Sequence, residues 1–529
     1  MLLMVSVILV PIVLGIFVYI LPRKLGKSVV FAVQAYLALV IASLFTRIVN
    51  YGTFHAVLGG DDPILYVTLR GDRPSLIFVG LSVILFFLAF VYAVRDENYC
   101  NNKFLSLFLV LQGTLNGIFV TDDIFNLFVL IEVSTVLATV LLLFKRDGRN
   151  AYDGLFYITM QIITMMFFLF GIAYLYRSFG VLNFTAMAEI VNAGVPRETL
   201  ILPFAFLITG IALKIGFFPL FTWISHAYGN PSAPFPVLAI LSGLFVKSSL
   251  FFVIRIHTIF YPTLDYTEFF IALGLITGVV GAVKAFAQKD IKLILAFSTI
   301  SQVGLITVGI FSGSVVSHYG SLMHIVNHAL FKSLLFLSAG MIAKTYQTTH
   351  VNEIKGLLKK MPVTAFATAI GILGIIGFPF INGSISKYWI MAEVSLTLEI
   401  ALWVVNTGTM LVFVKYSTML LGAGAPVKVD TLKNGVLLVL AIICVSTGIF
   451  GVPLANYLFD VNLTISIGSF ITKGAIFLGV LCGAIIINRT FLMKTDALYK
   501  LAKSPTTVQQ SCFILVVFFA SLVLYGFVR

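Results

Sequence analysis

Apolar runs of about 20 residues recur from one end of the sequence to the other. A helix needs about 20 apolar residues to cross the hydrocarbon core of a bilayer, so each run is long enough to span a membrane. The composition, 60% hydrophobic and only 10% charged, excludes a soluble globular domain. We therefore predict an all-α polytopic membrane protein with about 14 to 16 transmembrane helices.

The lysines and arginines between these runs are unequally divided between the two sides of the membrane. If the runs alternate in direction, one set of loops holds twenty of these residues and the other holds four, or six when two at helix ends are counted. Cations prefer the cytoplasmic side, so we expect a multi-pass protein of the cell membrane with both termini outside. The net charge of +13 then reflects cations beside anionic headgroups and requires no nucleic-acid partner.

The four cysteines give no sign of a cofactor. Cys100, Cys444, Cys482 and Cys512 are scattered singly, without the spacing of a disulfide framework, a metal site or an iron–sulfur cluster. We expect no cofactor and no metal in this chain. We also expect no catalytic chemistry in the chain itself, although it could serve as the pumping subunit of a redox-driven complex.

The most unusual stretch, GIALKIGFFPLFTWISH, places Lys214 in an apolar helix that Pro219 then breaks. Glu132 is the one acid of an earlier span, about ten residues or roughly 15 Å along its axis, and Lys247 lies at similar depth in the helix after the break. Desolvation and like charge favour a neutral lysine, whereas a nearby carboxylate favours the ammonium. Intramembrane ionisable residues usually mark an ion path. A packing carboxylate and a snorkelling lysine are the structural alternatives.

A second polar row lies in SLMHIVNHALFKSLLFLSAG, where His324, His328 and Lys332 are spaced by four residues. This spacing places them on one helix face over about 12 Å. Histidine can pass on a proton near neutral pH, which favours a relay. The alternatives are a hydrogen-bond ladder for helix packing and haem ligation, but histidines one turn apart cannot bind opposite axial positions of one iron.

The broken-helix motif then returns. IGFPF at residues 376–380 matches IGFFP at residues 215–219, with Pro379 and Gly383 as the expected breakers and Lys387 after them. The two motifs lie 161 residues apart, about the length of five helices, so we predict two inverted five-helix repeats, each containing a broken helix. Beyond these repeats, the last three spans carry no central charge except Lys473 near an outer end, and we expect them to pack against lipid or a partner.

The resulting division has four parts. We expect N-terminal support helices in residues 1–100, a first half-channel in 101–258, a second half-channel in 259–421 and C-terminal helices in 422–529.

Residues of about 100–420 resemble the antiporter-like membrane subunits of respiratory complex I, of Mrp-type cation/proton antiporters (MrpD-like) and of membrane-bound energy-converting hydrogenases. Each motif alone is weak, but the ordered set is specific. The motifs are LFVLIEVS, LKIGFFPLFTW, NPSAPFPVLAILSGLFVK, DIKLILAFSTISQVG, HIVNHALFK and GFPFINGSISK.

The resemblance implies a role for each buried ionisable residue. Glu132 and Lys214 would form the charge pair of the first half-channel, and Lys247 would link it to the second. The relay His324, His328 and Lys332 would follow, and Lys387 would open to the outer face. Two departures from the family are Ile224-Ser225 after the tryptophan and Gln302, where many members carry histidine.

These observations predict a proton-translocating subunit of a multi-subunit membrane complex. Its partners would be further antiporter-like and small membrane subunits, and an iron–sulfur or nickel–iron peripheral module in a hydrogenase-type host. Protons would pass through this chain, and sodium, if exchanged, would pass elsewhere, because a sodium site needs several oxygen ligands. A free-standing transporter of an organic solute and a non-conducting structural subunit are the alternatives.

Overall fold

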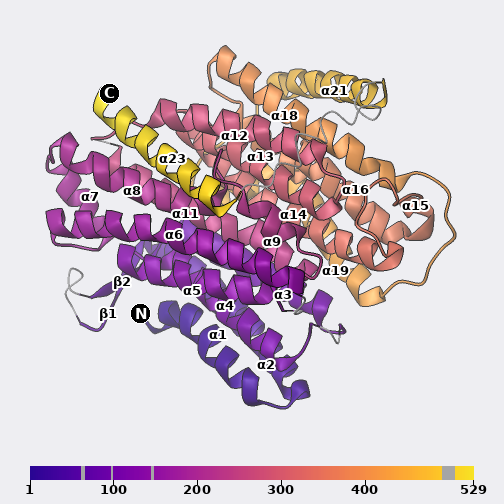
Figure 1. Cartoon of the computed structure of the whole chain (residues 1–529), viewed down its shortest axis with the longest axis horizontal. Coiled ribbons are helices and arrows are strands. Elements are labelled where there is room, and N and C mark those ends of the chain that lie inside the picture. Colours follow the sequence, from indigo (N-terminus) through magenta and orange to yellow (C-terminus); the bar gives the residue numbers. More distant parts are fainter. Residues whose placement is uncertain (61–65, 97–98, 145–147, 262, 491–506) are drawn as a thin grey trace. The chain divides into compact units, whose positions relative to one another are not determined.

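The structure is a computed structural model that describes residues 1–60, 66–96, 99–144, 148–261, 263–490 and 507–529 (Figure 1). Within these ranges, fifteen helices are long and apolar enough to cross a membrane. The predicted all-α polytopic fold is confirmed. A two-stranded antiparallel hairpin, β1 (Phe54–Leu58) and β2 (Val67–Gly71), lies between the second and third of these helices.

The helices are of two kinds. The long ones are α1 (Leu2–Ile20), α2 (Arg23–Tyr51), α3 (Arg73–Ala93), α4 (Asn102–Val120), α5 (Ile124–Leu142), α6 (Gly148–Phe179), α8 (Arg197–Ile215), α11 (Val246–Phe260), α12 (Thr267–Ala287), α13 (Ile291–Phe311), α14 (Val315–Tyr346), α18 (Leu396–Ser417), α19 (Thr431–Ile449), α21 (Ile467–Thr490) and α23 (Val508–Val528). The short ones are α7 (Phe184–Asn192), α9 (Trp223–Gly229), α10 (Phe235–Ile240), the π-helical turn η1 (Leu241–Phe245), α15 (Leu357–Lys360), α16 (Pro362–Ile376), α17 (Asn382–Ile390), the 3-10 turn η2 (Thr418–Leu420) and α20 (Gly451–Phe459). The helix α11 is grouped with the long ones because it continues α10 and η1 in one apolar span, Phe235–Phe260.

Polar side chains explain where many of these helices begin. An Asp, Asn, Ser or Thr just before the first turn accepts a hydrogen bond from an amide that has no partner within the helix. Caps of this kind start α3, α4, α5, α7, α13, α14, α18, α19 and α23.

The chain divides into two compact units. The first comprises Met1–Ile215, Asn230–Tyr266 and Thr507–Arg529. Its interior contains many phenylalanines, and the rings of Phe78 and Phe119 stack with centroids 5.4 Å apart. The C-terminal helix α23 packs against α8 and α6 of the same unit (Figure 1).

The second unit comprises Gly216–Gly229 and Thr267–Thr506. Its helices α12 and α13 pack closely because glycines face each other. A Cβ atom on Gly304 would lie only 2.3 Å from the backbone nitrogen of Gly278. Small residues permit such close approach of membrane helices, where helix association depends on packing. The four-part division and the inverted repeat remain predictions, since a compact unit is not a repeat.

Within the first unit, a charged cluster joins the hairpin to α3 and α11. Asp72 follows β2 and caps α3 by accepting from the amide of Ser75 at 2.9 Å. Its carboxylate also pairs with Arg70 at 2.9 Å and with Arg255 at 3.4 Å. Burial alone would raise the pKa of Asp72, but Arg255, the Ser75 hydrogen bonds and Arg70 outweigh burial and hold the pKa below its ordinary 3.8.

Asp72→Asn retains a cap acceptor but removes the negative charge beside Arg255, so we expect a loss of about 2–3 kcal/mol at neutral pH. Because the folded-state pKa of Asp72 is depressed, this stabilisation is present above 3.8 and disappears as pH falls through the lower folded value. Thermal unfolding in detergent at several pH values measures both effects.

The matched control is Ser395→Ala, which removes only an exposed cap of α18 and should cost about 1 kcal/mol or less at every pH. If Asp72→Asn costs no more than this control at pH 7, the ion pair does not stabilise the first unit.

Candidate functional site

In the first unit, α5 and α8 bring Glu132 and Lys214 close together. The Lys214 ammonium has no solvent exposure, and its Nζ donates to the Thr135 hydroxyl at 2.6 Å. Thr135 lies one turn beyond Glu132 on α5, and the half-buried carboxylate interacts electrostatically with the ammonium. Glu132 Oε1 is buried and has no hydrogen-bond partner within the described residues. The acid and the lysine are thus neighbours, but a neutral hydroxyl holds the ammonium.

Lys247 and Lys214 both contact the π-helical turn η1. The wider turn presents the carbonyl of Ser242, five residues before Lys247, and Lys247 Nζ donates to it. The ring of Phe245, at the end of the same turn, lies 5.8 Å from Lys214 Nζ. Gly243 adjoins Ser242, and a Ser-Gly pair is a known site of helix distortion, but the sequence does not otherwise indicate a π-helical turn.

The first helix break follows Lys214 directly. Helix α8 ends at Ile215, and Gly216 has φ of +81°, a conformation that favours glycine. Pro219 lies in the segment before α9 begins at Trp223. The chain leaves the first unit at this break and returns to it at Asn230.

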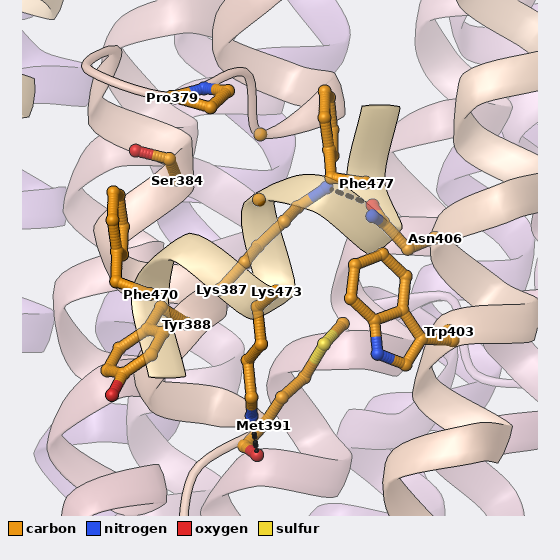
Figure 2. A pocket seen from close by; sticks show the side chains of 12 residues that line it. Pro379, Ser384, Lys387, Tyr388, Met391, Trp403, Asn406, Phe470, Lys473 and Phe477 are labelled. Carbon is orange, nitrogen blue, oxygen red and sulfur yellow. Dashed lines mark hydrogen bonds between the residues drawn. The ribbon is translucent and has the colours of Figure 1, made fainter. Parts of the chain in front are cut away.

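The second break positions Lys387 (Figure 2). Helix α16 ends at Ile376, and Pro379 has no N–H to offer the carbonyl of Ile375 four residues earlier. Lys387 Nζ occupies that acceptor at 2.6 Å and also donates to Asn406 Oδ1 at 2.6 Å. The lysine is only 4% exposed. The break therefore creates the acceptor that holds the buried ammonium.

Gly383 differs from its expected role as a helix breaker, because it lies inside α17. A Cβ atom there would lie 1.9 Å from the carbonyl oxygen of Gly374 on α16. Gly383 is therefore needed for the close approach of the two half-helices, and the turn itself is made at Gly377, which has φ of +85°.

The polar row on α14 is fully buried in the second unit. Lys332 Nζ donates to the Leu295 carbonyl at 2.7 Å and to the Ser298 hydroxyl at 2.6 Å. The rings of His324 and His328 lie 6.3 Å apart between centroids. The structure thus places the three predicted residues along one helix, with the lysine held by neutral oxygens of α13.

Gln302 forms the polar link that the sequence did not predict. Its Oε1 lies 3.1 Å from His324 Nε2, and its Nε2 donates to the Thr409 hydroxyl at 3.0 Å. On the other side of the ring, His324 Nδ1 lies 2.8 Å from Ser386 Oγ. With the amide in this orientation, His324 Nε2 donates and Nδ1 accepts. The sequence indicated only that Gln302 does not titrate.

The shared chemistry is a buried amine held by uncharged oxygens. Lys214, Lys247, Lys332 and Lys387 all donate to hydroxyl, amide or backbone oxygens. These oxygens can accept hydrogen bonds from lysine in its charged or its neutral form, because a neutral amine retains two N–H donors. Within the described residues, no group of three or more His, Cys, Asp or Glu could hold a metal ion.

The fold and these buried amines define the class: an antiporter-like polytopic membrane subunit. Residues 121–413, more than half of the chain, match the family described as NADH:quinone oxidoreductase/Mrp antiporter, TM. The chain belongs to this family. The resemblance seen in the sequence motifs is confirmed.

Named relatives support this assignment. The chain is 32% identical over 339 residues to NADH-quinone oxidoreductase subunit N of Desulforudis audaxviator, an alignment covering 61% of this chain and 66% of that protein, just under two thirds of its length. It is 29% identical over 396 residues to the D-type Na(+)/H(+) antiporter subunit of Alkalihalophilus pseudofirmus, covering 72% of this chain and 78% of that protein.

A solved structure supports the fold. A chain of the membrane-bound sulfane sulfur reductase, an archaeal respiratory membrane complex, superimposes with a TM-score of 0.81 at 26% identity. The match covers 90% of this chain and 99% of that one.

Gly383→Ala should disrupt the second break, because the added methyl group overlaps a backbone carbonyl that cannot move independently. We expect at least about 2 kcal/mol of destabilisation, measured as a lower apparent Tm of the purified protein. Gly435→Ala is the matched control. No atom would lie within 4 Å of its Cβ, and alanine in α19 should be neutral or stabilise by about 1 kcal/mol. Equal melting temperatures for the two variants would contradict the close approach of α16 and α17.

Proposed function

We propose that the chain is a proton-translocating subunit in which buried ionisable residues of both units carry H+. The residues are Glu132, Lys214 and Lys247 in the first unit and His324, His328, Lys332 and Lys387 in the second. The observation that carries the proposal is that the four lysine side chains are buried, 0 to 4% exposed, and that each donates to a hydroxyl, amide or backbone oxygen, which can accept from the charged or the neutral form of lysine. Ionisable residues buried inside a membrane protein usually mark an ion path.

The Glu132–Lys214 distance controls the first step. At an effective dielectric of about 20, two unit charges about 4 Å apart attract by roughly 4 kcal/mol, which corresponds to nearly three decades of proton affinity. Lys214 therefore holds its proton when Glu132 approaches and releases it when the carboxylate withdraws. The half-buried Glu132 carboxylate has one oxygen without a hydrogen-bond partner within the described residues, which supports this movement.

The buried residues favour protons over sodium. A sodium ion needs several oxygen ligands, preferably with a carboxylate among them, and ammonium groups repel it. The proposed residues include one carboxylate, Glu132, and four lysines. Sodium, if the complex exchanges it, therefore passes through another subunit.

The proposal also covers the complex in which the chain works and the membrane that holds it. Two of its relatives are called subunits, one of an oxidoreductase and one of a Na(+)/H(+) antiporter, which supports a multi-subunit complex with other membrane subunits as partners. In a redox-driven host, a peripheral module with iron–sulfur or nickel–iron centres would supply the energy. The unequal distribution of lysine and arginine supports a cell-membrane location with both termini outside.

Lys214→Gln should abolish proton transport, since glutamine retains a donor for Thr135 but cannot carry the proton. Glu132→Gln should slow transport by about tenfold or more, because the attraction that reloads Lys214 is lost. The measurement is proton uptake into membrane vesicles that contain the assembled complex, followed with a pH-sensitive dye.

Lys284→Gln is the control, since this half-buried lysine of α12 lies outside the proposed path. Detection of all subunits in each purified variant separates transport from assembly. Wild-type transport by assembled Lys214→Gln would refute the proposed function.

A further inference from the structure

An apolar groove lies between α16, α18 and α21, three helices of the second unit. Its volume is about 360 Å³. That volume would hold about twelve water molecules of about 30 Å³ each, but apolar walls disfavour water. Of the fourteen described residues that line the groove, ten are aliphatic or aromatic. Several of them, including Leu373, Val414, Leu481 and Ile485, are only half-buried, so the groove is open at the surface of the unit.

The length of the groove matches one leaflet of a membrane. On α21 its lining extends from Leu481 to Arg489, which corresponds to about 12 Å of helix. On α16 it extends from Ala369 to Ile376, where the helix ends, or about 10 Å. The hydrocarbon core is about 30 Å thick, so the groove covers most of one leaflet and stops near its middle. A transmembrane helix of a partner would contact both leaflets, whereas an acyl chain occupies only one.

The polar residues of the groove lie at the end that the positive-inside distribution assigns to the cytoplasm. Ser417 and Thr418 lie where α18 ends, and Asn488 and Arg489 lie in the last turn of α21. Asn488 Nδ2 donates to the Leu411 carbonyl of α18 at 3.3 Å, which holds this end of α21 beside α18. Arg489 is exposed, and it is the one charged residue among the described lining residues. The groove therefore has an apolar body and a cationic mouth at the depth of the lipid headgroups.

The arginine at the mouth favours an anionic occupant. Its planar guanidinium can donate two parallel hydrogen bonds to a phosphate. No Asp or Glu is among the described residues that line the groove, so the lining itself supplies no negative charge to Arg489. A phospholipid combines a phosphate with acyl chains, and these two parts match the mouth and the body of the groove. Attraction to a basic residue near the membrane surface is stronger for an anionic headgroup than for a zwitterionic one.

We propose that this groove binds one acyl chain of an anionic phospholipid from the cytoplasmic leaflet, with the lipid phosphate at Arg489. Within the described residues, α21 packs chiefly against α18 (Figure 1). The bound chain fills the space between α21 and α16 and so connects α21 to a second helix of its unit. None of the residues of the proposed proton path is among the described lining residues. The inference therefore does not depend on the proposed function.

Photocrosslinking tests whether a lipid occupies the groove. The assembled complex is placed in nanodiscs of phosphatidylcholine that contain a small amount of a photoreactive lipid. The probe is phosphatidylglycerol, an anionic phospholipid, with a diazirine at the end of one acyl chain. The control probe is phosphatidylcholine, a zwitterionic phospholipid, with the same diazirine-labelled chain. After illumination, mass spectrometry of peptides identifies the labelled residues.

We expect phosphatidylglycerol to label the groove-lining residues of α16 and α21, with the strongest labelling near Ile376 and Leu481, the deep end of the groove. Labelling of these residues by phosphatidylglycerol should exceed labelling by phosphatidylcholine by about threefold to fivefold, because only the former has a net negative headgroup. Equal labelling by the two probes would refute an anionic lipid. Absence of labelling in the groove would show that a partner protein covers it, and that result would overturn the proposal.

Three variants separate the charge from the groove. Arg489→Gln should lower labelling by phosphatidylglycerol to the level of phosphatidylcholine, and the exposed position of Arg489 should leave folding intact. Lys359→Gln is the matched control, since this exposed lysine of α15 does not line the groove, and it should change neither probe. Ala369→Phe adds a ring to the groove from α16 and should weaken labelling by both probes. If Arg489→Gln keeps the wild-type preference, the phosphate does not lie at Arg489 and the assignment is wrong.

Discussion

Backbone carbonyls at two helix irregularities accept hydrogen bonds from two of the buried lysines. Pro379 leaves the Ile375 carbonyl without an amide, and Lys387 donates to it. In the π-helical turn η1, Lys247 donates to the Ser242 carbonyl. In a bilayer every backbone acceptor must find a partner within the protein, so each helix irregularity and its lysine stabilise one another. The irregularities therefore explain how these two ammonium groups can be buried with neutral oxygens as their hydrogen-bond partners.

Hydrogen bonds to neutral oxygens also suit proton transfer, because they favour neither the charged nor the neutral form of lysine strongly. A carboxylate within hydrogen-bond distance would hold the ammonium by several kcal/mol, and a fully apolar pocket would expel its charge. Neutral oxygens stabilise the ammonium less than a carboxylate does and more than an apolar pocket does. Glu132 is the single acid of the proposed path. It lies one turn from Thr135, and under the proposal it would change the charge of Lys214 without being the permanent partner.

Much of the fold and part of the site could be predicted from sequence. Hydropathy predicted the membrane helices, and the motif around Gly216 and Gly377 located both interruptions, because apolar length and local backbone chemistry are encoded in adjacent residues. The acceptors Thr135, Asn406 and Gln302 could not be predicted, since they lie on helices far away in sequence and depend on helix rotation. The contact of Lys473 on α21 with Glu399 on α18 could not be predicted for the same reason.

Substitution of Lys332 by arginine tests the central claim most directly. Arginine keeps the positive charge and the donors to Leu295 and Ser298, but it does not release its proton within proteins. The measurement is proton transport by the assembled complex containing Lys332→Arg, relative to wild type. The relay account predicts that transport is lost although the complex assembles. Transport at the wild-type rate would contradict it and would show that Lys332 is a fixed structural cation.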